Sequence, residues 1–252
     1  MSMKYLGGKS RIASHVERLV SASSSERGCY IEPFVGGAAT FSRLAPHFQT
    51  ASGYDVVPDL VMMWQAAIDG WTPPTELSVD EYTELRTAEP SPLRGFAGFG
   101  CSYGGKWFGG YARDKTGRVG RDGLPYSEVR TSARTVTRQA AQLRNATVTL
   151  ADYRDVLVPR DAVVYADPPY AGTTGYEAAD PFDTAEFWKT AEGWATGGAT
   201  VLVSEHCAPA PWVRVWEKPY ASYLRGDQKP GFRTEAVFML PDAAARVLRD
   251  AA

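Results

Sequence analysis

The sequence is poor in the residues that build metal sites and disulfide scaffolds. It has three cysteines and three histidines among 252 residues, and no two cysteines form a C-x-x-C pair. Scattered thiols and imidazoles do not provide the paired spacing of a structural zinc site or a disulfide framework. We therefore expect no metal site and a protein of a reducing compartment.

Long apolar runs are also missing. No stretch approaches the ~20 apolar residues that cross a bilayer, and the first four residues contain no apolar signal core. This predicts a cytoplasmic protein without a membrane partner. The chain has 44% hydrophobic residues and is long enough for one large α/β core or a core with an insertion. A monomer is the simplest expectation.

The overall charge is close to neutral, but its distribution is uneven. Residues 94–144 carry a net charge of +7, whereas residues 1–93 carry −4 and residues 145–252 carry −5. A basic segment between acidic flanks indicates a surface for a polyanion. For any single residue of the segment, a solvated basic face with aromatic rings in an accessory core is an equally good explanation. The candidates for contacts with nucleic acid are Tyr103, Lys106, Trp107, Arg113, Lys115, Arg118 and Arg121.

Strand and helix patterns alternate on both sides of this basic segment. We expect strands at residues 29–31, 49–54, 147–150, 162–166 and 200–204, and a terminal hairpin of 213–218 with 236–240. We expect helices at residues 12–20, 38–44, 59–68, 79–87 and 127–145. The alternation predicts a parallel sheet with crossover helices. The predicted organisation is a catalytic domain of residues 1–70 and 145–252, interrupted by an inserted domain of residues 71–144.

The most informative motif is Asp167-Pro168-Pro169-Tyr170, which follows the expected strand at 162–166 directly. An acid at the carboxyl end of a parallel strand lies where open α/β sheets bind their ligands. The two prolines donate no N–H groups, so nearby carbonyls are free to accept hydrogen bonds, and an aromatic ring follows. The motif predicts a site for a flat, amine-bearing ring such as a nucleobase. A proline turn that merely ends the strand is the alternative.

A glycine-bearing turn and a second strand-end acid form the other half of a possible site. The turn at residues 32–37 reads E-P-F-V-G-G, which allows a cofactor to approach the backbone but lacks the spaced glycines of an NAD site. Asp55 ends the next strand about twenty residues later, where an acid binds ribose hydroxyls in nucleotide-binding folds. A helix N-cap or a solvated loop acid is the competing interpretation of Asp55.

Together these motifs resemble the Dam-like, D-P-P-Y-type adenine-N6 DNA methyltransferases. The matching segments are residues 4–9 (K-Y-L-G-G-K), the turn at 32–37, Asp55 and the D-P-P-Y motif, in the order found in that family. The resemblance implies a doubly wound, Rossmann-like α/β sheet of seven strands that carries a smaller, inserted target-recognition domain made mainly of helices and loops. It also implies S-adenosylmethionine as the cofactor and double-stranded DNA as the substrate.

The resemblance further implies roles for individual residues. S-adenosylmethionine would be held by Tyr5, Lys9, Glu32, Phe34, Gly36, Asp55, Asp152 and Tyr153. Within this set, Lys9 would lie near the cofactor carboxylate, Asp55 at the ribose, and Asp152 with Tyr153 at the adenine. Asp167 and the Pro168 carbonyl would accept the N–H bonds of the target amine, and Tyr170 would stack on the flipped-out base.

Two further features belong to this resemblance. The family often has glycine where this sequence has Ala38. A late segment containing Lys229, Arg233 and Glu235 resembles a family segment that adjoins the DNA.

Other amino-methyltransferases and a silent relative are the alternatives. Cytosine-N4 enzymes tend to carry Ser or Thr before the Pro-Pro pair and glutamine enzymes carry Asn, so Asp167 favours adenine, whereas RNA as substrate stays open. A catalytically silent DNA-binding relative is disfavoured because Asp167, Lys9 and Asp55 are all present. The predicted activity is site-specific adenine methylation of DNA, restriction-linked or phage-associated.

Overall fold

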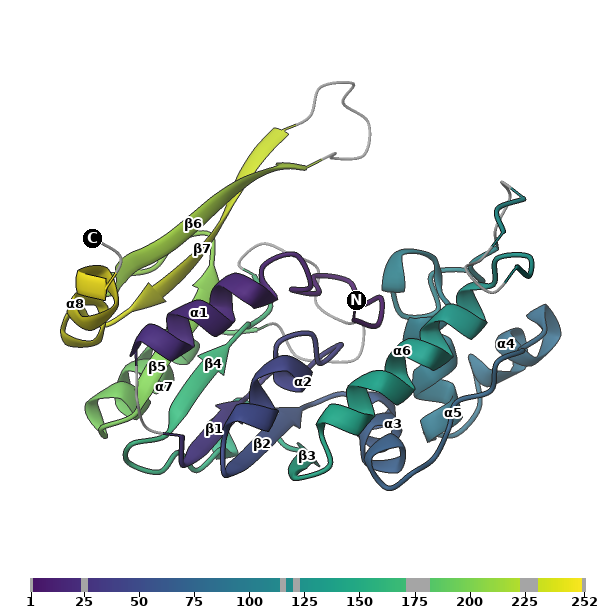
Figure 1. The fold of residues 1–252 in the computed structure, drawn as a ribbon, viewed down its shortest axis with the longest axis horizontal. Coiled ribbons are helices and arrows are strands. Elements are labelled where there is room, and N and C mark those ends of the chain that lie inside the picture. The colour runs from purple at the N-terminus through teal and green to yellow at the C-terminus, as the bar shows by residue number, and fades with distance from the viewer. Residues whose placement is uncertain are drawn as a thin grey trace.

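The computed structural model describes residues 2–23, 27–113, 117–119, 123–170, 182–222 and 231–250. Its centre is a seven-stranded sheet in the order β3-β2-β1-β4-β5-β7-β6 (Figure 1). The strands are β1 Cys29–Glu32, β2 Thr50–Asp55, β3 Ala146–Leu150, β4 Val163–Ala166, β5 Thr200–Glu205, β6 Val213–Ser222 and β7 Gly231–Met239. The first five are parallel, whereas β7 runs antiparallel to both of its neighbours. The predicted doubly wound, Rossmann-like sheet is confirmed.

Helices cover both faces of this sheet. The longer ones are α1 Ala13–Ser23, α3 Pro58–Ile68, α6 Glu128–Gln142, α7 Thr184–Thr196 and α8 Pro241–Asp250. Shorter ones are α2 Phe41–Leu44, α4 Val79–Leu85, α5 Pro92–Gly95, and the single turns η1 Ala45–His47, η2 Phe96–Gly100, η3 Tyr103–Gly105 and η4 Tyr153–Asp155. None of the helices in the described part of the chain is long and apolar enough to cross a membrane.

Two hydrophobic clusters lie on opposite faces of the sheet because side chains alternate along each strand. Tyr30, Val163 and Leu202 belong to the cluster that packs under α1, α2, α3 and α6. Their neighbours Ile31 and Val164 belong to the other cluster, which packs against α7. The central strand β4 is buried over its whole length. Continuous apolar sequence is what a parallel strand covered on both faces requires.

Three sequence-based expectations about elements need correction. The helix expected from residue 38 begins only at Phe41, because Ala38 has a positive φ of 50° and interrupts the helix. The strands of the terminal hairpin are longer than predicted. Helices α7 and α8 were not predicted, although Asp183 caps the first turn of α7 through the amides of Ala185 and Glu186.

The helices α4, α5 and α6 lie together beside α3, at the β3 end of the sheet (Figure 1). A buried ion pair ties this group to the sheet domain: Arg94 Nη1 lies 2.6 Å from Asp59 Oδ2 of α3. The same guanidinium donates to the Leu85 and Arg86 carbonyls. The rings of Phe96 and Phe99 belong to the cluster that also contains sheet residues. These helices therefore share one core with the sheet.

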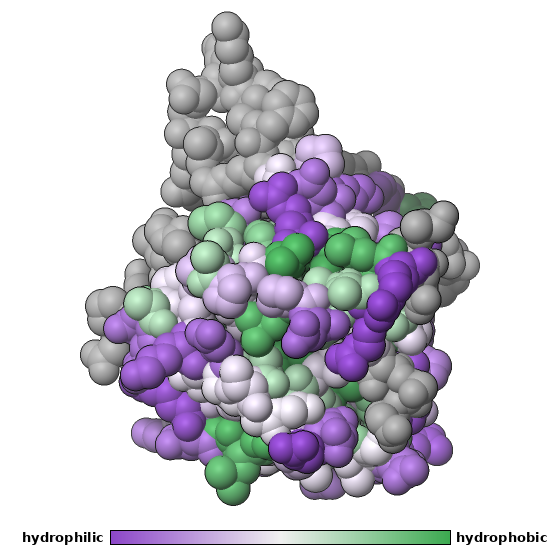
Figure 2. Space-filling view, turned by 90° about the vertical axis from the view of Figure 1, so that its left-hand side faces the viewer, coloured by the Kyte–Doolittle hydropathy of each residue, from purple (hydrophilic) through white to green (hydrophobic). Residues whose placement is uncertain are grey.

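The β6 end of the sheet, where α8 packs against β6 and β7, forms one side of the molecule. Figure 2 shows hydrophobic and hydrophilic residues interspersed on the described part of that face. Scattered apolar side chains of this kind are ordinary for a protein surface.

We expect Arg94→Met to lower the free energy of unfolding by about 3 kcal/mol, because it leaves the Asp59 carboxylate buried without its partner. Arg214→Met is the matched control, since Arg214 pairs with Glu217 at an exposed site and should cost less than about 1 kcal/mol. Urea denaturation of both variants measures the difference. Equal destabilisation by the two substitutions would contradict a special role for the Asp59–Arg94 pair.

Candidate active site

Acidic residues gather at one edge of the sheet, where the parallel strands end. Glu32 ends β1, Asp55 ends β2, Asp167 follows β4 and Glu205 ends β5. These strands are neighbours in the sheet, so their carboxyl ends form one continuous edge. Glu235 of β7 joins the same group, because its ion pair with Lys9 places it beside Asp167. This is the edge at which open α/β sheets bind ligands.

Lys9 places a single ammonium group between two of these carboxylates. Its Nζ lies 2.7 Å from Asp167 Oδ1 and 3.3 Å from Glu235 Oε1, and it donates to the Gly7 carbonyl at 3.1 Å. The ammonium also lies 4.5 Å from the centre of the Tyr170 ring. Burial lowers the pKa of Lys9, but the two carboxylates outweigh it and raise that pKa above its ordinary value. The ammonium therefore stays charged and joins the N-terminal motif to the D-P-P-Y motif.

Asp167 keeps acceptor capacity beside this neighbour, because a carboxylate has more lone-pair positions than one ammonium uses. Its side chain is 19% exposed, and the buried Oδ1 pairs with the Lys9 ammonium at 2.7 Å. Burial raises the pKa of Asp167 to about 6, against the opposing effect of Lys9. At neutral pH the group is an ionised hydrogen-bond acceptor.

Tyr170 is fixed by β7 and by His206, which directly follows β5. The Tyr170 hydroxyl donates to Glu235 Oε1, and the ring meets the His206 ring edge-on at a centroid distance of 4.6 Å. His206 Nδ1 is in turn 2.8 Å from the Thr234 carbonyl oxygen. Pro168 is buried, whereas Pro169 is exposed.

The glycine turn after β1 is closed by Asp55 and covered by Tyr5. The Gly36 amide donates to Asp55 Oδ2 at 2.9 Å, and the Val57 amide donates to Oδ1 at 3.1 Å. A Cβ atom on Gly36 would lie 2.8 Å from the Tyr5 ring, and one on Gly37 would lie 2.7 Å from Tyr5 Cβ. The sequence-predicted residues Tyr5, Gly36 and Asp55 are therefore brought into contact. Asp55 thus joins the turn through Oδ2 to the start of α3 through Oδ1, and burial raises the pKa of this carboxyl.

Glu32 lies beneath the turn and is only 1% exposed. It accepts hydrogen bonds from the Tyr30 hydroxyl and from Thr40 Oγ1, the latter at 3.0 Å. Burial raises its pKa to about 8, although both hydrogen bonds oppose the shift. Glu32 is therefore mainly protonated at neutral pH, and it adds little negative charge to the acidic edge.

Aromatic rings lie toward the β3 end of this edge. Phe34 packs against Tyr153 and Phe182 at centroid distances of 5.5 and 6.0 Å, and Phe34 is only half-buried. Asp152 binds the Arg154 side chain at 2.7 Å and the Arg154 amide at 2.9 Å, so hydrogen bonding lowers its pKa.

The residues along this edge fit S-adenosylmethionine. Lys9 is a charged partner for the carboxylate end of an amino acid, and the rings at Phe34 and Tyr153 suit a flat base. These groups would hold the cofactor along the ends of β4, β1, β2 and β3.

The residues expected to contact DNA fall into two groups. Tyr103 is 78% exposed, and Lys106, Arg113 and Arg118 are exposed as well. Trp107 instead packs against Phe99 and Phe108 at centroid distances of 4.7 and 4.8 Å. Lys115, Arg121 and Lys229 lie outside the described residues, as does the side chain of Arg233.

Several residues of the site were not among those singled out from the sequence. Glu205 also ends a parallel strand, so the rule that selected Asp55 and Asp167 could have found it. Glu235 was noted only as adjoining DNA, and its contact with Lys9 depends on antiparallel pairing of β7. The Gln139 amide bonds to the glycine turn from a remote helix, and no local sequence signal identifies it.

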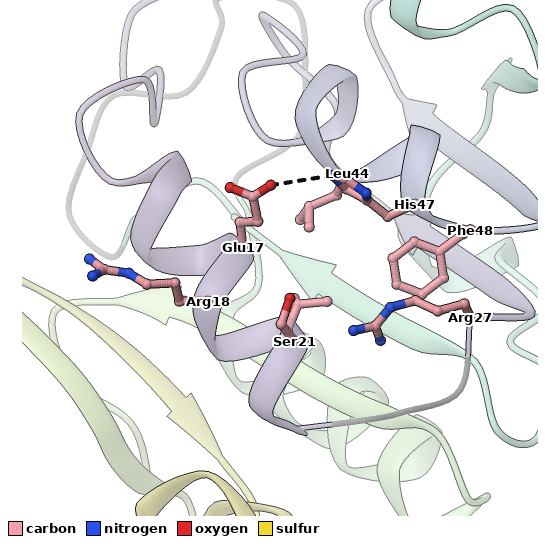
Figure 3. A pocket seen from close by; sticks show the side chains of 8 residues that line it. Glu17, Arg18, Ser21, Arg27, Leu44, His47 and Phe48 are labelled. Atoms are coloured by element: carbon pink, nitrogen blue, oxygen red, sulfur yellow. Dashed lines mark ion pairs between the residues drawn. The ribbon is translucent and has the colours of Figure 1, made fainter. Parts of the chain in front are cut away.

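A separate pocket lies at the opposite edge of the sheet, between α1 and η1 (Figure 3). His47 Nε2 is 3.3 Å from the Glu17 carboxylate there, and the Arg27 guanidinium lies 5.3 Å from the centre of the Phe48 ring. None of the sequence-predicted site residues lines this pocket.

Comparison with known proteins finds one protein family whose model matches part of this chain. Residues 5–90 match the model of the D12 class N6 adenine-specific DNA methyltransferases. The match contains the N-terminal motif, the glycine turn and Asp55, and it confirms the resemblance to Dam-like adenine methyltransferases.

No curated protein matches the chain. A solved structure named "Putative methyltransferase yhhF from Escherichia coli" shares 11% identity and a TM-score of 0.40, over 95% of this chain and 90% of that one.

We expect Glu32→Gln to remove a pH-dependent loss of stability. The folded protein binds the Glu32 proton up to about pH 8, whereas the unfolded chain releases it near pH 4.5. Between these values unfolding releases a proton, so this group lowers the free energy of unfolding by about 1.4 kcal/mol per pH unit as pH rises.

Thermal and urea unfolding between pH 5 and 8 measure the free energy of unfolding. That of Glu32→Gln should therefore rise relative to that of the wild type as the pH rises. The exposed Glu192→Gln is the control and should follow the wild type. A constant difference between Glu32→Gln and the wild type across this range would contradict the raised pKa.

Proposed function

We propose that the protein transfers the methyl group of S-adenosylmethionine to the N6 amine of an adenine in double-stranded DNA. The observation that carries this proposal is the Asp167 carboxylate directly after β4, paired with the Lys9 ammonium and followed by the Pro168 carbonyl and the Tyr170 ring. A carboxylate that keeps acceptor positions beside an aromatic ring suits an aromatic amine. The D12-class match over residues 5–90 supports the same substrate.

The chemistry requires the amine to become a better nucleophile, because its lone pair is delocalised into the ring. The Asp167 carboxylate and the Pro168 carbonyl accept its two N–H bonds and draw the nitrogen toward tetrahedral geometry. Bound S-adenosylmethionine supplies an activated methyl group. Asp167 stabilises the positive charge that develops on nitrogen, and with a pKa of about 6 it is able to hold the proton that the amine loses.

The surrounding residues hold Asp167 and the target base in place. The Lys9 ammonium fixes the carboxylate, and Glu235 fixes both Lys9 and the Tyr170 hydroxyl. The base leaves the duplex at a cost of a few kcal/mol. Stacking on Tyr170 offsets about 1–3 kcal/mol of this cost.

The basic segment supplies the binding surface for DNA in this proposal. Residues 71–144 act as the target-recognition domain, and the net charge of +7 on residues 94–144 attracts the phosphate backbone. Exposed Lys106, Arg113 and Arg118 contact phosphates or bases. Tyr103, whose ring is exposed, is better placed to stack on a base than Trp107, which packs against other rings.

The direct test uses labelled S-adenosylmethionine and unmodified duplex DNA. Asp167→Asn should reduce the rate of methyl transfer by a factor on the order of 10² or more, because the amide both accepts and donates and carries no charge. Asp69→Asn, at an exposed site, should keep the wild-type rate. Long-read sequencing then maps the modified adenines. Transfer of label to RNA or protein instead of DNA, or full activity of Asp167→Asn, would contradict the proposal.

Salt dependence tests the DNA surface. Lys106→Ala and Arg118→Ala should each weaken binding to duplex DNA and reduce the slope of log K against log[salt] by about 0.9 if each contacts one phosphate. Lys189→Ala, an exposed substitution on α7, should leave the slope unchanged. Fluorescence anisotropy titrations at salt concentrations from about 50 to 200 mM measure the binding constants that give this slope. An unchanged slope in the first two variants would exclude them from the phosphate contacts.

A further inference from the structure

One side chain of helix α6 joins three separate parts of the candidate cofactor site. Gln139 is 4% exposed and points its amide at the glycine turn. Its Nε2 lies 3.0 Å from the Gly37 carbonyl oxygen and 2.9 Å from that of Ala38. Its Oε1 accepts the Met3 amide at 2.8 Å. The buried amide thus connects α6, the turn after β1 and the N-terminal segment.

The turn needs such support at Ala38. This residue has a φ of 50°, which lies in the left-handed region. Residues other than glycine adopt this backbone conformation only at a cost in free energy. It is fully buried, and its carbonyl also accepts the Ser42 hydroxyl at 2.7 Å. The two bonds from Gln139 reach the consecutive carbonyls that the left-handed residue reorients. These two hydrogen bonds therefore stabilise the positive φ of Ala38, which is otherwise unfavourable for alanine.

The same junction positions Tyr5, which covers the turn. Met3, bonded to Gln139, lies two residues before Tyr5, and the Leu6 amide donates to the Gly105 carbonyl at 3.1 Å. A Cβ atom on Gly105 would lie 2.5 Å from the Tyr5 amide nitrogen. Tyr5 is consequently confined between the glycine turn and residues of the basic segment. A shift of the glycine turn or of Met3 would therefore change the space that Tyr5 occupies.

We propose that Gln139 is a positioning residue for S-adenosylmethionine: it holds the turn at Ala38 and the N-terminal segment in the arrangement that binds the cofactor. This role rests on the proposed function, since it assumes that the turn receives S-adenosylmethionine. Gln139 touches no reacting group in this account. Its action passes through the Gly37 and Ala38 carbonyls and through Met3.

The test compares two substitutions of the same kind on one helix. Gln139→Met keeps the approximate shape of the side chain and removes all of its hydrogen bonds, whereas Gln142→Met changes an exposed residue one turn away. Isothermal titration with S-adenosylmethionine, without DNA, should show a dissociation constant about tenfold higher for Gln139→Met and unchanged for Gln142→Met. With DNA, the KM for S-adenosylmethionine should rise by a similar factor, while kcat at saturating cofactor stays near the wild-type value.

A second substitution separates positioning from general stability. Glycine adopts a positive φ without strain, so Ala38→Gly in the Gln139→Met protein should restore part of the lost affinity. If Gln139→Met does not fold, Gln139→Asn, which keeps a shorter amide, replaces it with the same expected loss and rescue.

The possible results distinguish this role from the proposed function. A folded Gln139 variant with a lower melting temperature but the wild-type dissociation constant would overturn the positioning role and leave the proposed function intact. A weakened variant that Ala38→Gly does not improve would overturn the part played by Ala38. A wild-type protein that binds no S-adenosylmethionine would overturn the proposed function itself.

Discussion

A single buried ammonium group balances the carboxylates at the ligand-binding edge of the sheet. The order of the parallel strands forces Glu32, Asp167 and Glu205 onto neighbouring strand ends, and β7 adds Glu235. Several ionised carboxylates cannot remain buried together without compensation. Lys9 provides it for Asp167 and Glu235, and Glu32 meets the same constraint by keeping its proton, since its pKa is about 8.

The path of the N-terminal segment follows from this requirement. For Lys9 to reach the end of β4, residues 3–8 must cross the carboxyl edge above the glycine turn. Tyr5 packs on that turn, and Leu6 bonds to Gly105 on the other side. The segment therefore contacts the sheet domain and the basic segment at once. This explains why Asp167, the candidate cofactor site and the candidate DNA surface all lie around one short stretch of the chain.

The sequence predicted most of the sheet because its strands are short apolar runs that end in turns or acids. The position of Asp167 at a strand end followed from the prolines after it, and the D12-class match over residues 5–90 supports the family that the ordered motifs suggest. Other features depend on tertiary contacts that no local pattern records. Ala38 interrupts the expected helix, and Trp107 packs against rings rather than facing solvent. Helices α7 and α8 went unpredicted although both carry local signals: Asp183 caps α7, and α8 is strongly amphipathic. Glu235 and Gln139 reach the site from remote elements.

The ionisation of Asp167 tests the account most directly. Carbon-13 NMR titration of the aspartate side-chain carboxyls, with the Asp167 signal assigned by comparison with Asp167→Asn, measures its pKa in the wild-type protein. We expect a pKa of about 6 for Asp167, because burial outweighs the neighbouring ammonium. We also expect a higher value in Lys9→Met, where that ammonium is absent. A wild-type pKa at or below 3.8, the ordinary value for aspartate, or no response to the loss of Lys9, would contradict it.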